Sequence, residues 1–124
     1  MPPSDGHWPT IFLLGAQKAA SSSLFATLVQ HPLIADPTSA FNNDKEAHFF
    51  HHHASNTSRL QIAYRRKFPC AWPVRGMDGT PSYLYDPERV IPRMIAARTI
   101  SETTSFLVVL REPVARDWSM FRML

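Results

Sequence analysis

Two short runs of consecutive apolar residues, 11–14 and 106–110, are the most strand-like parts of this chain. Both have the length of a buried strand, and we expect a third, short strand near 74–77. Helices are predicted at 22–30, near 59–68, from 86–87 to about 98 with a restart at Pro92, and after 110. Strands that alternate with helices predict a parallel sheet covered on both faces, a three-layer α/β/α fold.

The segment between the first strand and its helix reads G-A-Q-K-A-A-S-S-S-L from Gly15 to Leu24. A loop of small residues lets backbone N–H groups approach an anion, and the helix that follows directs its positive dipole end at the same place. Lys18 adds a mobile positive charge. The segment therefore predicts a P-loop-like phosphate-binding loop, and its simpler alternative is a helix start capped by serines.

The order of residues in this loop differs from the common G-x-x-x-x-G-K-[ST] phosphate loop, because Lys18 comes only three residues after Gly15. It is similar to the 5′-phosphosulfate loop of the sulfotransferases, which use 3′-phosphoadenosine 5′-phosphosulfate (PAPS) as co-substrate. The family often has glycine where this chain has Ala20, and alanine fits there if its φ is negative. The resemblance implies that the donor is held by Lys18, Ala19, Ala20, Ser21 and Ser22.

A second motif follows the strand 106–110 and reads L-R-E-P-V-A-R-D-W-S. Pro113 suits the first turn of a helix, so Arg111 is expected at the carboxyl end of the strand, where α/β sheets bind ligands. The motif resembles L-R-[DE]-P-x-x-R-x-x-S, the 3′-phosphate-binding motif of the same family. The resemblance implies that Arg111 and Ser119 hold the 3′-phosphate of the donor. Without it, the pattern is that of a buried strand followed by a solvated helix.

A third segment, D-K-E-A-H-F-F at 44–50, is similar to the [KN]-E-x-H-F-F stretch of heparan sulfate and related Golgi-type sulfotransferases. There the glutamate is taken as the catalytic base, which implies this role for Glu46. In extended chain His48 lies on the same side as Glu46, and a carboxylate beside an imidazole suits removal of a hydroxyl proton. The alternative is a solvent-facing acid beside a structural histidine.

A fourth segment, G-M-D-G-T-P-S-Y at 76–83, matches the family pattern [ED]-x-[ST]-P-x-Y. Some heparan sulfate enzymes carry lysine where this chain has Gly79, so heparan sulfate itself is a doubtful acceptor. The resemblance runs from Pro9 to Leu124 and covers the front part of a family domain. We expect residues 1–9 to be a disordered segment and 10–124 to be the N-terminal part of a sulfotransferase domain, with a last helix that ends while still apolar.

These resemblances imply in-line transfer of a sulfuryl group from PAPS to a hydroxyl or amine of a carbohydrate or similar acceptor. Lys18 would stabilise the leaving phosphate, and no metal is required. One alternative is a P-loop nucleotide kinase, which would need an aspartate for Mg²⁺ at a strand end, where this chain has Arg111. The other is a truncated, catalytically inactive protein that binds nucleotide weakly.

Composition and charge agree with a globular nucleotide-binding chain of 124 residues, 44% hydrophobic and with a formal net charge of +3. The basic balance suits a polyanionic donor and an anionic glycan acceptor. Nucleic acid is not expected, because the aromatic residues do not interleave with the basic ones. His48 and the histidines at 51–53 do not have the arrangement of a metal site, since side chains alternate along extended chain.

Sequence features bearing on the compartment are few. No apolar run reaches the length of a membrane span, and the N-terminus does not read as a signal peptide. Cys70 is the single cysteine, and Asn56 begins a glycosylation sequon. The resemblance implies the Golgi lumen if the chain is like the eukaryotic members of the family, and the cytoplasm if it is like bacterial relatives.

Overall fold

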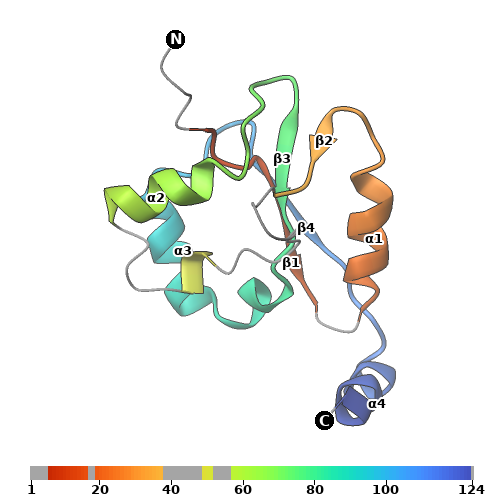
Figure 1. Ribbon diagram of the computed structural model, residues 1–124. Helices are drawn as coiled ribbons and strands as arrows, with labels where there is room; N and C mark the ends of the chain where they lie inside the picture. Colours follow the sequence, from red (N-terminus) through yellow and green to blue (C-terminus); the bar gives the residue numbers. More distant parts are fainter. Residues whose placement is uncertain (1–5, 17–18, 38–48, 52–56, 124) are drawn as a thin grey trace.

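The computed structural model describes residues 6–16, 19–37, 49–51 and 57–123, which form a four-stranded parallel sheet in the order β2-β3-β1-β4 (Figure 1). The strands are β1 (Ile11–Gly15), β2 (Ile34–Ala35), β3 (Arg75–Asp78) and β4 (Ser105–Val108). The α-helices are α1 (Ser21–Leu28), α2 (Ser58–Arg65), α3 (Pro87–Ala96) and α4 (Pro113–Met123), and two 3₁₀ helices are η1 (Phe49–His51) and η3 (Pro81–Tyr85). The predicted parallel α/β fold is confirmed.

Alternation along β1 builds a core on each face of the sheet. Ile11 and Leu13 face α1, where they pack with Phe25 and Met77. Phe12 faces the other way, into a larger cluster formed with η1, α2, η3 and α3. Figure 1 shows this division, with α1 on one side of the sheet and α2 and α3 on the other. The three layers of the fold follow from this alternation.

Two details of the predicted elements are different in the structure. The helix α3 runs through Pro92 without a break, where a restart had been expected. Proline lacks only its own N–H, so the helix loses one hydrogen bond there while its buried side chains Val90 and Met94 keep it on the core. The short strand β2 was not predicted, because a pair of residues carries no periodic signal.

The chain is already packed before residue 10. The backbone N–H of His7 donates to the carbonyl oxygens of Arg65 (3.2 Å) and Phe68 (3.0 Å). Trp8 contacts the aromatic cluster on that face, with its ring centroid 6.0 Å from the ring of Tyr64. Residues 6–9 therefore join α2 to the sheet.

The last helix extends away from the sheet (Figure 1). Its apolar residues Val114, Trp118 and Phe121 are largely exposed, as is Leu110 in the segment that leads into it. None of the described helices is both long and apolar enough to cross a membrane. What fixes the start of α4 is its connection to the end of β4, which places it beside the loop after β1.

Candidate nucleotide-binding site

The loop after β1 ends at Ala20, which precedes the first turn of α1 and has φ 64° and ψ 25°. This is the left-handed region, so the negative φ on which the fit of an alanine depends is not found: the chain turns here as a glycine would, and alanine bears the strain. As the N-cap residue of α1, Ala20 makes no side-chain cap hydrogen bond. An uncapped helix start directs amide N–H groups and the positive end of the helix dipole at an anion.

The end of β4 is tied to the start of this loop by two backbone hydrogen bonds. The N–H of Ala16 donates to the carbonyl oxygen of Val109, and the N–H of Val109 donates to that of Gly15, both at 2.8 Å. Since β1 and β4 are parallel neighbours, their carboxyl ends meet at the same edge of the sheet. The residues that follow each strand are thereby brought together.

A cavity of about 310 Å³ opens at this edge. Its walls come from the start of α1 and from the two ends of the second motif, and its lining residues are Ala20, Ser21, Ser22, Ser23, Arg111 and Ser119. Five of these six were predicted as donor-binding residues from the sequence; Ser23 was not. Two motifs about ninety positions apart thus meet in one cavity that presents hydroxyls, a guanidinium and a helix start, which together suit a phosphate group.

The start of α4 is occupied by Glu112, a residue that the sequence analysis did not single out. Its carboxylate accepts hydrogen bonds from the N–H groups of Val114 (3.0 Å) and Ala115 (2.8 Å). These bonds lower the pKa of the exposed Glu112 carboxyl. Because a carboxylate already caps α4, the helix start that remains for a ligand anion in the cavity is that of α1. An acid directly before a helix-starting proline was the available signal.

Three predicted site residues, Lys18, Glu46 and His48, lie outside the described residues. Ala19 is described and is buried, and its N–H donates to the carbonyl oxygen of Ala16 at 3.3 Å. Ala19 therefore stabilises the conformation of the loop, whereas the cavity is lined by the residues after it.

The D-G-T-P-S-Y segment builds a buried carboxylate site beneath η1. Asp78 is fully buried and accepts hydrogen bonds from the hydroxyls of Tyr64 (2.6 Å) and Tyr83 (3.1 Å). Thr80 donates to its other oxygen from both the backbone N–H (3.1 Å) and the hydroxyl (2.7 Å). Burial raises the pKa of Asp78 although these bonds oppose it. This carboxylate has no access to a ligand, so its role is to hold β3, η3 and α2 together.

Burial also raises the pKa values of the two tyrosines well above the usual range, with the Asp78 charge as the next cause. The tyrosines are therefore neutral hydrogen-bond donors at physiological pH. Across the described residues, no group of three or more histidine, cysteine, aspartate or glutamate side chains is placed to hold a metal ion.

The fold and the cavity define an α/β protein with a candidate anion-binding site at the carboxyl edge of a parallel sheet. The chain is similar to the crystal structure of a sulfotransferase from Alicyclobacillus acidocaldarius, with 30% sequence identity and a TM-score of 0.70. The match covers 94% of this chain and 49% of that one, so the chain spans about half the length of this sulfotransferase. No protein-family model and no curated protein matches the chain. The likeness supports the sulfotransferase family and does not single out its Golgi type.

Proposed function

We propose that this chain is the donor-binding part of a PAPS-dependent sulfotransferase that acts on a hydroxyl or amine of a carbohydrate or similar acceptor. The observation that carries the proposal is the cavity in which the start of α1 meets Arg111 and Ser119. A donor with phosphate groups at both the 3′ and 5′ positions needs two sets of anion ligands, and the cavity offers one at the start of α1 and one at Arg111 and Ser119. The sulfotransferase with the same fold adds independent support.

In the proposed reaction the loop and the start of α1 bind the 5′-phosphosulfate, while Arg111 and Ser119 bind the 3′-phosphate. The acceptor oxygen attacks sulfur as the bond between sulfur and the bridging phosphate oxygen breaks. The electron pair of that bond stays on the leaving 5′-phosphate, and Lys18 with the loop N–H groups stabilises the growing charge. Glu46, assisted by His48, takes the proton of the acceptor.

A transfer assay with labelled PAPS and a panel of carbohydrate acceptors can distinguish the roles assigned to Lys18 and Arg111. Arg111→Ala should weaken donor affinity by about 1.5–3 kcal/mol, roughly 10- to 150-fold, as expected for a lost charged hydrogen bond. Lys18→Ala should in addition lower turnover at saturating donor, because its partner gains charge only in the transition state. Lys67→Ala, two residues after the end of α2, is the matched control.

If saturating PAPS restores full turnover to Lys18→Ala, the role given to this lysine is wrong. Absence of sulfuryl transfer by the unaltered chain to every acceptor, despite donor binding, would reduce the function to nucleotide binding. Tighter binding of Mg-ATP than of PAPS would favour a kinase.

A further inference from the structure

The 3₁₀ helix η1 follows directly after the segment that contains Glu46 and His48, and it is too short to hold itself in place. Its two phenylalanines are buried in the core, with Phe50 completely inaccessible to solvent. The rings of Phe49 and Tyr64 stack with centroids 4.3 Å apart. Packing of these side chains therefore holds η1 against the core, and polar contacts must set the orientation of its backbone.

The backbone of Phe50 is held on both sides by side chains from other elements. Its N–H donates to the hydroxyl of Tyr83 at 3.3 Å, and its carbonyl oxygen accepts from Nη1 of Arg93 at 2.9 Å. Tyr83 is itself fixed, because its hydroxyl donates to the buried Asp78. Hydrogen bonds thus connect Asp78 of β3, through Tyr83 of η3, to Phe50 of η1.

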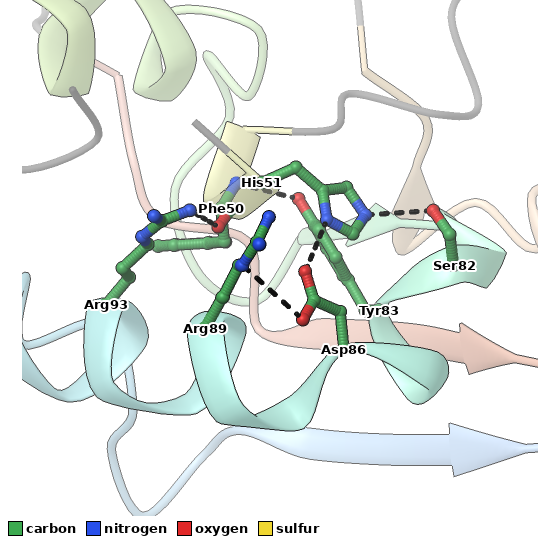
Figure 2. A network of polar contacts seen from close by, with 7 residues as sticks. All are labelled: Phe50, His51, Ser82, Tyr83, Asp86, Arg89 and Arg93. Atoms are coloured by element: carbon green, nitrogen blue, oxygen red, sulfur yellow. Dashed lines mark hydrogen bonds and ion pairs between the residues drawn. The ribbon is translucent and has the colours of Figure 1, made fainter. Parts of the chain in front are cut away.

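His51 continues this attachment with its side chain. Figure 2 shows its ring between Ser82 and Asp86, with Nε2 2.8 Å from Ser82 Oγ and Nδ1 3.7 Å from Asp86 Oδ2. In the described part of the chain, α3 adds two charged groups to this network: Arg93, bonded to Phe50, and Arg89, whose Nε is 4.0 Å from Asp86. An imidazole with a partner at each nitrogen has a defined orientation.

The same 3₁₀ helix η3 touches the donor loop. A Cβ placed on Gly15, the last residue of β1, would lie 2.6 Å from the carbonyl oxygen of Pro81. Pro81 begins η3 and is followed by Ser82 and Tyr83, the partners of η1. The anchor of η1 and the start of the phosphate-binding loop are therefore in direct contact.

We propose that His51 and Tyr83 are positioning residues that hold η1, the element directly after Glu46 and His48 in the sequence, against η3 and beside the donor loop. The inference rests on the proposed function, because it assigns these residues to the geometry between acceptor and donor. In this assignment His51 transfers no proton; its hydrogen bond to Ser82 is what matters. A displacement of about 1 Å can cost a reaction about 100-fold in rate, so loss of the anchor should lower turnover without weakening donor binding.

The test compares His51→Ala, His51→Gln and Tyr83→Phe with Glu88→Gln, which changes an exposed side chain on the first turn of α3. Turnover should fall 10-fold or more in His51→Ala and Tyr83→Phe, while the dissociation constant for 3′-phosphoadenosine 5′-phosphate (PAP) stays within twofold. His51→Gln should recover most of the turnover, because the glutamine amide can reach Ser82 as Nε2 does but cannot act as a base near neutral pH. Glu88→Gln should match the unaltered chain.

Hydrogen exchange gives a readout that does not depend on transfer. The amide of Phe50 should exchange faster in Tyr83→Phe by more than the change in global stability accounts for, and its exchange should be unaltered in Glu88→Gln. If Tyr83→Phe does not fold, the two His51 variants, at a half-buried position, carry the test alone.

Three results would overturn the inference. Equal loss of turnover in His51→Gln and His51→Ala would make the imidazole a proton-transfer group. Unaltered turnover in His51→Ala and Tyr83→Phe would show that the attachment does not serve the reaction. If the unaltered chain binds PAP yet transfers no sulfuryl group, the proposed function fails and the inference fails with it. If the unaltered chain transfers sulfuryl groups and the variants do so equally well, only the inference fails.

Discussion

Replacement of Tyr64 by phenylalanine isolates one hydrogen bond of the buried Asp78 site. The Tyr64 hydroxyl donates to Asp78 Oδ2 at 2.6 Å from within the core. The ring itself can stay in place, because it stacks on Phe49 and meets Phe68 edge-on at 5.5 Å. The substitution therefore removes a donor to a buried carboxylate and little else.

A hydrogen bond to a charged group contributes about 1.5–3 kcal/mol to stability, and burial keeps this one from solvent screening. Asp78 retains its bonds to Tyr83 and Thr80, so we expect a loss of about 2 kcal/mol at neutral pH. In a chain of this size, each kcal/mol of lost stability lowers the melting temperature by about 3–5 °C, so this loss should lower it by about 6–10 °C.

The cost should depend on pH with a defined sign. Burial raises the pKa of Asp78, and the Tyr64 bond opposes that rise, so its removal raises the pKa further. A carboxyl whose folded pKa is raised contributes stability that is present below its unfolded pKa of about 3.9 and is lost as pH rises through the folded pKa. The variant has the higher folded pKa, so its deficit should be smaller in acid than at neutral pH.

Urea unfolding at pH 7 and pH 4.5 measures both quantities, with Tyr85→Phe on the exposed side of η3 as control. The control should stay within about 0.5 kcal/mol of the unaltered chain. A deficit of less than 0.5 kcal/mol in Tyr64→Phe at neutral pH, or one that grows in acid, would refute the description of Asp78 as a buried, hydrogen-bonded carboxylate.

Three further predictions concern the edge of the sheet. Ala20→Gly should raise stability by about 0.5–1 kcal/mol in thermal unfolding, because glycine adopts the left-handed conformation without strain; a destabilised variant would contradict it. Gly15→Ala, with φ 149° and a Cβ 2.6 Å from the carbonyl oxygen of Pro81, should cost more than about 2 kcal/mol; a melting temperature within 2 °C of the unaltered chain would refute that contact. Glu112→Gln should speed hydrogen exchange of the two amides that this carboxylate accepts from. Because its pKa is lowered, the capping stability is present above the unfolded pKa of about 4.3 and is lost as pH falls through the folded pKa, so equal exchange in both proteins at pH 7 would argue against the cap.

The apolar runs were sufficient to predict β1 and β4 as strands, and β1 is buried as expected of a parallel strand that is apolar on both faces. The expected burial of β4 is wrong, because Phe106 and Val108 are exposed. The strand β4 ends at Val108, two residues before the apolar run does, since the backbone turns at Val109 to bond Gly15 and the loop. The strand β2 and the 3₁₀ helix η3 were missed. Both depend on contacts with distant residues, such as the pairing of Ile34 with Arg75, and leave no local pattern.

The sequence named most of the residues that line the cavity, because each motif directly follows a strand and parallel strands end at one edge. Their role as ligands stays a prediction. Three features could not be read from the sequence: the left-handed Ala20, the Glu112 cap and the partners of Asp78. Each is decided by tertiary geometry, in the last case by a tyrosine fourteen positions before Asp78, on the helix α2.

The most direct test of the proposed donor site is calorimetric binding of PAP, 5′-AMP and Mg-ATP to the chain and to Arg111→Ala, with no metal in the PAP titration. We predict that PAP binds without Mg²⁺ and at least 10-fold more tightly than 5′-AMP, and that Arg111→Ala removes this preference because it removes the 3′-phosphate contact. Equal affinity for PAP and 5′-AMP, an Arg111→Ala variant that keeps the preference, or tighter binding of Mg-ATP would contradict the account.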